Sequence, residues 1–138
     1  GTFDGGREKA PAAICRKIAK AVISNDHRIE IWGDGEQTRS FTFIGDTLKG
    51  IDLLMASQYH LPLNIGSSED VSINQLVDIV EEIAGIKVER NYLLDAPKGV
   101  RGRNSDNTLI KELFDWAPNV SLRDGLAETY TWIYEELV

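Results

Sequence analysis

The chain has 138 residues, of which 42% are hydrophobic and 27% are charged, and this composition predicts one ordinary domain with a single core. Its 22 acidic residues outnumber 15 lysines and arginines, so the formal net charge of −7 argues against nucleic acid or an anionic membrane as a partner. Any phosphate site must therefore be local. A single cysteine excludes a disulfide framework, and without a signal peptide or long apolar run we expect a cytoplasmic location.

Hydrophobic periodicity predicts an alternation of helices and short strands along the chain. Helices are expected where apolar residues recur every three or four positions, and strands where apolar residues alternate with polar ones. The predicted helices cover residues 10–23, 46–57, 73–84, 108–114 and 121–137. The predicted strands cover residues 29–32, 38–43, 63–66 and 86–93.

Several of these helices carry end signals. The segment 72–75 has the form of a capping box, and Gly85 suits the left-handed residue that ends a helix. Asp46 is a candidate N-cap for the second helix, and either Asp106 or Asn107 is a candidate for the fourth.

Some residues that often carry chemistry are interpreted here as structural. Cys15 lies in an apolar segment, which favours a core thiol over a nucleophile. Trp116 and Trp132 are interpreted as core anchors. His27 and His60 have no serine, cysteine or carboxylate cluster at a meaningful spacing, so no metal site is predicted around them.

The segment from Lys98 to Asn107 is the first candidate for binding chemistry. It contains two arginines and two glycines, and a guanidinium fork matches two phosphate oxygens while glycine lets the backbone approach closely. A diphosphate is the natural ligand for such a segment. The alternative is a solvated loop that ends in the N-cap of the next helix, and the segment alone leaves both open. Arg39 shares a strand face with aromatic residues, so it either snorkels or points into a pocket.

Three separated segments, taken in order, match one family. They are Gly33-Asp-Gly-Glu-Gln-Thr-Arg-Ser-Phe-Thr-Phe-Ile44, Asn64-Ile-Gly-Ser-Ser-Glu-Asp-Val-Ser-Ile73, and Arg103-Asn-Ser-Asp106 with Trp116-Ala-Pro118. Together they resemble the C-terminal part of the extended short-chain dehydrogenases/reductases that act on nucleotide sugars. Within that family, segments 5–17 and 99–107 are similar to the GDP-mannose 3,5-epimerases in particular.

The resemblance implies an α/β fold in which residues 1–138 form a single C-terminal substrate-binding domain. A few of its strands would normally join a Rossmann sheet, whose N-terminal core is absent from this chain. The implied partner is a nucleotide-diphosphate sugar such as GDP-mannose. Lys9 matches a catalytic lysine that helps to move protons at the sugar ring, although it is equally compatible with an exposed first-turn lysine. The implied substrate-binding residues are Glu8, Ala10, Lys17, Gln37, Thr38, Arg39 and Arg103.

In the family, NAD oxidises the sugar C4 hydroxyl, which acidifies the neighbouring carbons. This sequence has no Gly-x-x-Gly-x-x-Gly fingerprint and no Tyr-x-x-x-Lys pair, so we expect it to bind no cofactor and to turn over no sugar alone. Strand edges at 41–44 and 63–65 would lie exposed, which predicts self-association or pairing with a missing Rossmann half. The alternative is a stand-alone, non-catalytic module that binds nucleotides or another protein.

Overall fold

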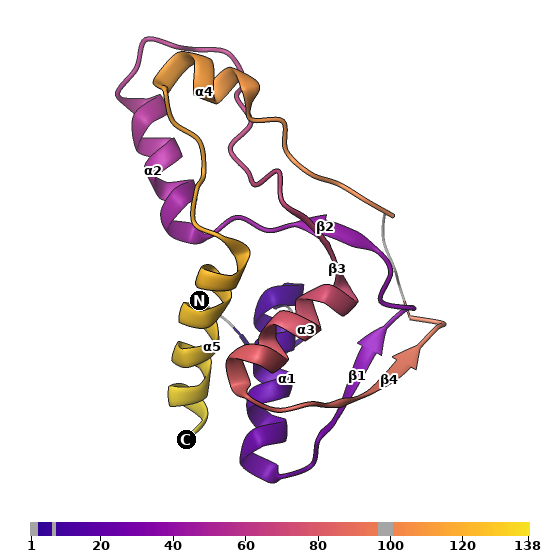
Figure 1. The fold of residues 1–138 in the computed structure, drawn as a ribbon. Helices are drawn as coiled ribbons and strands as arrows, with labels where there is room; N and C mark the ends of the chain where they lie inside the picture. The colour runs from indigo at the N-terminus through magenta and orange to yellow at the C-terminus, as the bar shows by residue number, and fades with distance from the viewer. Residues whose placement is uncertain (1–2, 7, 97–100) are drawn as a thin grey trace.

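The computed structural model describes residues 3–6, 8–96 and 101–138, and Figure 1 shows their arrangement. Helices and strands alternate along these residues, as expected for an α/β fold. The helices are α1 (Ala10–Ser24), α2 (Ile44–Met55), α3 (Ile73–Ala84), α4 (Thr108–Phe114) and α5 (Leu122–Leu137). The strands are β1 (Arg28–Trp32), β2 (Thr38–Ser40), β3 (Asp70–Ser72) and β4 (Glu89–Leu93).

The core lies where α1, α3 and α5 pack together in the lower part of the molecule (Figure 1). Each helix turns an apolar face inward, and β1 adds its two buried isoleucines. Cys15 is fully buried in this core, and burial raises the pKa of its thiol to about 12, which confirms a core thiol. The fully or almost fully buried core residues include Ile18, Ile31, Leu76, Val77, Val80, Leu126 and Ile133.

Two small sheets flank the core. Strands β1 and β4 pair in parallel, with Ile31 opposite Tyr92, while β2 and β3 pair antiparallel, with Arg39 opposite Val71. The free edge of β2 is lined by an extended segment at 101–103, whose carbonyls accept backbone hydrogen bonds from Thr38 (2.9 Å) and Ser40 (3.1 Å). The described part of the arginine-rich segment is therefore attached to β2 along its main chain.

The capping prediction holds for α3, which has the clearest signals. The Ser72 side chain accepts a hydrogen bond from the Gln75 N–H, and the Gln75 side-chain oxygen accepts one from the Ser72 N–H. Gly85 takes a left-handed conformation with φ of 69°. Ser121 caps α5 by accepting from the Asp124 N–H. Asn107 occupies the N-cap position of α4, but its side chain makes no capping bond and donates instead to the Gly66 carbonyl at 2.7 Å. The neighbouring Asp106 accepts from the Thr108 N–H.

Asp46 is not a helix cap, which corrects the prediction. Helix α2 begins two residues earlier, at Ile44, and the Asp46 side chain is buried. Its carboxylate accepts hydrogen bonds from the backbone N–H groups of Asn119 and Val120, both at 2.8 Å. Two amide donors from a connection far along the chain satisfy this carboxylate better than a local cap would.

Four other predictions were wrong in whole or in part. Residues 63–66 form no strand, because the described residues offer them no strand to pair with. The strand expected at 38–43 ends at Ser40, and the strand expected at 86–93 begins at Glu89, since pairing extends only that far. Trp132 keeps 40% of its surface exposed and packs edge-on against Phe3, so it borders the core rather than anchoring it.

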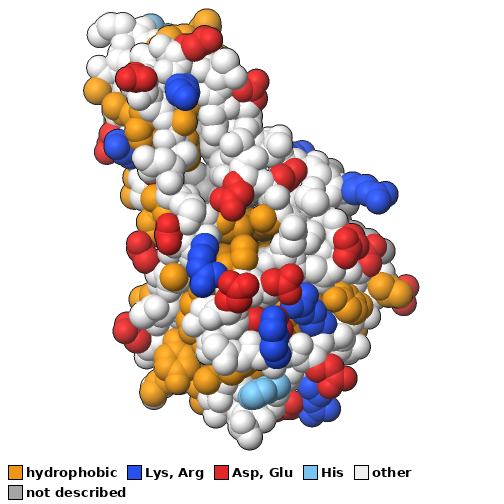
Figure 2. All heavy atoms as spheres, viewed as in Figure 1, with side chains coloured by type: hydrophobic (Ala, Val, Ile, Leu, Met, Phe, Trp, Pro, Cys, Tyr) orange, Lys and Arg blue, Asp and Glu red, His pale blue; other side chains and the backbone are white. Residues whose placement is uncertain are grey.

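Helices α2 and α4 stand apart from the body, at the top of Figure 1. We call residues 44–65 and 107–118 the α2/α4 lobe. Large apolar side chains remain exposed on this lobe, and Figure 2 shows hydrophobic atoms reaching its surface. Those on α2 recur at helical spacing and so form one stripe: Ile44, Leu48, Ile51 and Met55.

Candidate functional site

A cavity of about 480 Å³ lies between the first half of α1, strand β1 and strand β2, and we call it the polar cavity. Its charged side chains come from three separate segments, although the chain as a whole is acidic. Five of the eight residues predicted for ligand contact line it: Glu8, Ala10, Lys17, Gln37 and Arg39. The remaining lining residues are Gly6, Ala13, Ile14, Arg16, Glu30, Ile31, Trp32 and Ile73.

Glu8 and Arg16 form an ion pair in the wall of this cavity. One guanidinium nitrogen of Arg16 donates to Glu8 Oε1 at 2.5 Å, and the two side chains are only 4% and 18% exposed for Glu8 and Arg16, respectively. The backbone N–H of Glu8 and then the Arg16 hydrogen bond hold the pKa of the Glu8 carboxyl below its usual value. Sequence reasoning missed Arg16. The spacing was the available signal, because eight residues are about two helical turns and so place Arg16 on the same side of the helix as Glu8.

Lys17 lies beside this pair and contacts β1. Its ammonium donates to the backbone carbonyl of Glu30 at 2.5 Å. Burial lowers the pKa of Lys17, while the nearby Glu30 charge acts in the opposite direction. A lysine in this setting is a cation held at the cavity wall by the backbone of a strand.

Gln37 and Arg39 enter the cavity from the second sheet. The Gln37 side-chain nitrogen donates to the Trp32 carbonyl at 3.0 Å, while its side-chain oxygen is buried with no partner among the described residues. Arg39 donates to the Thr38 carbonyl at 2.5 Å and lines the cavity. Of the two alternatives for this side chain, a place in a pocket therefore holds rather than snorkelling to the surface. Because β2 ends at Ser40, Phe41 turns away to a different cavity.

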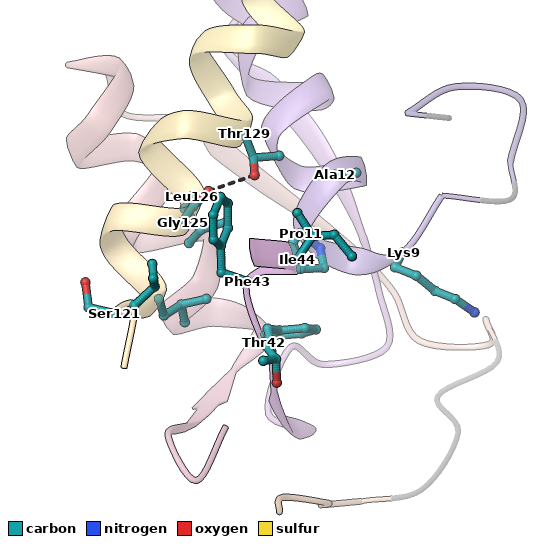
Figure 3. Close-up of a pocket in the computed structure, with 13 residues that line it drawn as sticks. Lys9, Pro11, Ala12, Thr42, Phe43, Ile44, Ser121, Gly125, Leu126 and Thr129 are labelled. Carbon is teal, nitrogen blue, oxygen red and sulfur yellow. Dashed lines mark hydrogen bonds between the residues drawn. The ribbon is translucent and has the colours of Figure 1, made fainter. Parts of the chain in front are cut away.

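Three predicted site residues lie elsewhere. Thr38 faces the backbone of Gly102, with its hydroxyl 2.8 Å from where a Cβ on that glycine would stand. Arg103 is exposed, and its carbonyl, but not its side chain, is tied to β2. Lys9 lies at the rim of a second cavity of about 370 Å³, and Figure 3 shows its side chain extending away from that cavity.

This second, apolar cavity lies where α1, the start of α2 and α5 meet. Figure 3 shows Phe43 against the Gly125 and Leu126 turn of α5, with Thr129 donating to the Gly125 carbonyl at 2.7 Å. A Cβ on Gly125 would stand 3.0 Å from the Phe43 ring, so the helix approaches the ring closely because it has glycine there. Few polar groups face this cavity, so it offers little to a charged ligand.

Within residues 3–6, 8–96 and 101–138, no three His, Cys, Asp or Glu side chains group together as metal ligands would. None of the described helices combines the length and apolar character needed to cross a membrane.

Comparison with known proteins shows the family of this chain. A family model described as GDP-mannose 4,6 dehydratase matches residues 4–129. The chain belongs to this family. It is 52% identical over 137 residues to GDP-mannose 3,5-epimerase 1 of Oryza sativa subsp. indica, a match that covers 99% of this chain and 35% of the relative. The resemblance to nucleotide-sugar epimerases and dehydratases is therefore confirmed.

Solved structures agree with the family. UDP-glucose 4-epimerase of Thermotoga maritima, determined with UDP-glucose, superposes with a TM-score of 0.83 at 29% identity, over 96% of this chain and 41% of that one. UDP-glucuronic acid 4-epimerase of Bacillus cereus, determined with NAD, has a TM-score of 0.75 at 28% identity, over 92% and 38%. The chain thus spans about a third of the length of the curated relative and about two fifths of these structures.

The described residues do not fit NAD. A dinucleotide needs a glycine-rich turn that leads from a strand directly into a helix N-terminus, where the pyrophosphate sits. After β1 the chain turns at Gly33 and Gly35 but enters strand β2, and the next helix begins only at Ile44. The polar cavity is lined by charged side chains rather than by such a turn.

Proposed function

We propose that this chain is the nucleotide-sugar-binding portion of an NAD-dependent sugar-nucleotide epimerase and that its ligand resembles GDP-mannose. The polar cavity is the observation that carries the proposal, because it gathers Glu8, Lys17, Gln37 and Arg39 from segments up to about thirty residues apart. Residues 1–138 act as one substrate-binding domain and turn over no sugar alone.

The charges of the polar cavity suit a diphosphate that carries a sugar. Arg39 and Lys17 supply cationic donors, and a guanidinium can bind two phosphate oxygens at once. Glu8 and the free oxygen of Gln37 supply acceptors, which match the hydroxyl and N–H donors of a sugar or a base. A cavity of about 480 Å³ takes part of such a ligand, so the rest would contact other protein.

Three more residues outside the polar cavity are proposed to contact the ligand: Lys9, Thr38 and Arg103. Lys9 is exposed next to Glu8 and is proposed to move a proton at the sugar ring once the ligand is bound. Thr38 lies on β2 next to Arg39, and Arg103 lies on the segment that is hydrogen-bonded to β2. Both are proposed to contact the diphosphate. NAD would be held by the remaining part of the full-length enzyme, where it supplies hydride transfer, and a cytoplasmic location is proposed for it.

The α2/α4 lobe supports the proposal of a missing Rossmann half. The Ile44, Leu48, Ile51 and Met55 side chains are 62%, 55%, 40% and 79% exposed, which is unusual for one continuous face of a helix. The chain also spans only about a third of the length of its curated relative. We propose that the remaining part of the protein covers this stripe, and that the isolated chain associates with itself instead.

The binding proposal is tested by titrating GDP-mannose and GDP into the chain by calorimetry. We expect saturable binding that Arg39→Ala weakens tenfold or more and that Arg103→Ala also weakens. Arg28→Ala is the matched control, because Arg28 is exposed and pairs with Asp26 away from the cavity. Equal binding by wild type and both Arg39→Ala and Arg103→Ala would refute the diphosphate assignment. Conversion of GDP-mannose by this chain supplied with NAD would refute the claim that it cannot turn over alone.

A further inference from the structure

The Glu8 and Arg16 pair leaves two buried polar atoms without partners. Glu8 Oε1 accepts from Arg16, but Glu8 Oε2 and Arg16 Nε have no hydrogen-bond partner among the described residues. Buried polar atoms of this kind are rare in proteins and call for a ligand or water to satisfy them. Both residues line the polar cavity, so the unpaired acceptor and donor are buried in the wall of the space that a ligand would occupy.

Arg16 supports the Glu8 side chain from helix α1. Glu8 precedes α1, and Lys9 at the N-cap makes no side-chain capping bond, so the helix start does not fix the carboxylate. The Arg16 guanidinium instead reaches back from the second turn of α1 to Glu8, and it lies 3.6 Å from Asp4 in the same leading segment. One arginine thus ties this segment to α1.

We propose that Arg16 is a positioning residue, which holds the Glu8 carboxylate so that its second oxygen accepts a hydrogen bond from a hydroxyl or N–H of the nucleotide sugar. This inference rests on the proposed binding function. Without Arg16, a carboxylate that is 4% exposed loses its charge partner, so it either turns towards water or takes up a proton. In both cases the ligand loses its acceptor.

The inference predicts a pattern across Arg16→Met, Arg16→Lys and Glu8→Gln in GDP-mannose titrations. Arg16→Met weakens binding at pH 7 at least fivefold, and Arg16→Lys recovers part of the loss. In the Glu8→Gln background, Arg16→Met has less than a twofold further effect, because the residue through which it acts has gone. Arg28→Met removes the same charge away from the cavity and leaves affinity unchanged.

The pH dependence of affinity separates positioning from a general loss of structure. The charged groups around Glu8 in the polar cavity are Arg16 and Lys17 from α1, Glu30 from β1 and Arg39 from β2. Wild-type affinity stays constant as the pH falls towards 5, because the Glu8 backbone N–H and the Arg16 hydrogen bond lower the pKa of the Glu8 carboxyl and keep it ionised. In Arg16→Met the affinity falls at a higher pH, since the unpaired carboxyl protonates more readily.

Three outcomes decide the inference. If wild type binds and Arg16→Met binds equally well with the same pH profile, Arg16 has no positioning role, while the binding function stands. If Arg16→Met weakens binding equally with and without Glu8, Arg16 acts directly and the inference is overturned. If wild type does not bind at all, the proposed function fails and the inference falls with it. Should Arg16→Met not fold, as judged by circular dichroism, Arg16→Lys combined with Glu8→Gln completes the same cycle.

Discussion

The side chain of Asn74 occupies the space that a Cβ on Gly35 would need, with its Oδ1 atom 2.3 Å from that position. Asn74 also donates its backbone N–H to the Gly35 carbonyl at 3.0 Å, and its side chain donates to Glu36 at 2.7 Å. The start of α3 therefore holds the turn that leads to Gln37. This contact fixes one wall of the polar cavity from outside it.

Gly35→Ala is expected to destabilise the protein strongly. Gly35 has a φ of +77°, which costs a residue with a Cβ about 1–2 kcal/mol, and the collision with Asn74 adds to that cost. Urea unfolding measures the loss. Gly85→Ala is the matched control, because Gly85 has a similar φ of +69° but nothing within 4 Å of its Cβ position. Equal losses in the two variants would show that the Asn74 contact is unimportant.

Asp46→Ala is expected to loosen the connection between the α2/α4 lobe and the body. The Asp46 carboxylate is buried and accepts from Asn119 and Val120, so its removal leaves two amides unsatisfied at a cost of roughly 2–3 kcal/mol. Chemical unfolding measures that cost, and hydrogen exchange at these two amides reports the local opening. Asp52→Ala changes an exposed carboxylate on the same helix and should leave both measurements near those of wild type.

Glu81 should make stability depend on pH. Burial alone would raise the pKa of Glu81, but hydrogen bonds from Lys87 and the Val88 N–H, together with the Arg90 charge, outweigh burial and hold it below 4.5. Figure 2 shows acidic and basic side chains intermingled over this part of the surface, around α3. A lowered carboxyl pKa stabilises the folded state above the ordinary value, and this stability is lost as the pH falls below 4.5 through the folded pKa.

The test compares urea unfolding of wild type and Glu81→Gln at pH 7 and at pH 3. Glu81→Gln should be less stable by roughly 2–3 kcal/mol at pH 7, because the Val88 N–H and the mostly buried Arg90 guanidinium lose a charged acceptor, and the difference should shrink at pH 3. Glu82→Gln is the control, since Glu82 is 60% exposed and pairs with Arg123 at the surface. A difference that stays constant with pH would contradict the assignment.

The isolated chain is expected to associate through the stripe on α2. Light scattering should show an average mass above that of the monomer at high concentration, because water contacts four apolar side chains along one helix face. Leu48→Glu with Met55→Glu should restore the monomer. Leu94→Glu introduces a charge at another exposed apolar residue and should not do so. A wild-type chain that stays monomeric at high concentration would count against this prediction.

Local signals predicted the helices well because local interactions determine them. The capping box at Ser72, the glycine at Gly85 and the Ser121 cap each act within one turn, so the sequence shows donor and acceptor together. The strands were predicted less well. A strand needs a neighbour, and residues 63–66 have none among the described strands, while β2 extends only as far as its pairing with β3.

The sequence by itself determined the family and the helices, and it named five of the thirteen residues that line the polar cavity, because residue types and short-range spacing carry that information. Only the tertiary structure decided that Arg16 supports Glu8, that Asp46 binds a connection more than seventy residues away, and that Arg103 meets β2 through its backbone. Buried polar groups must find partners, and which partner is within reach depends on how distant segments pack rather than on the residues beside them.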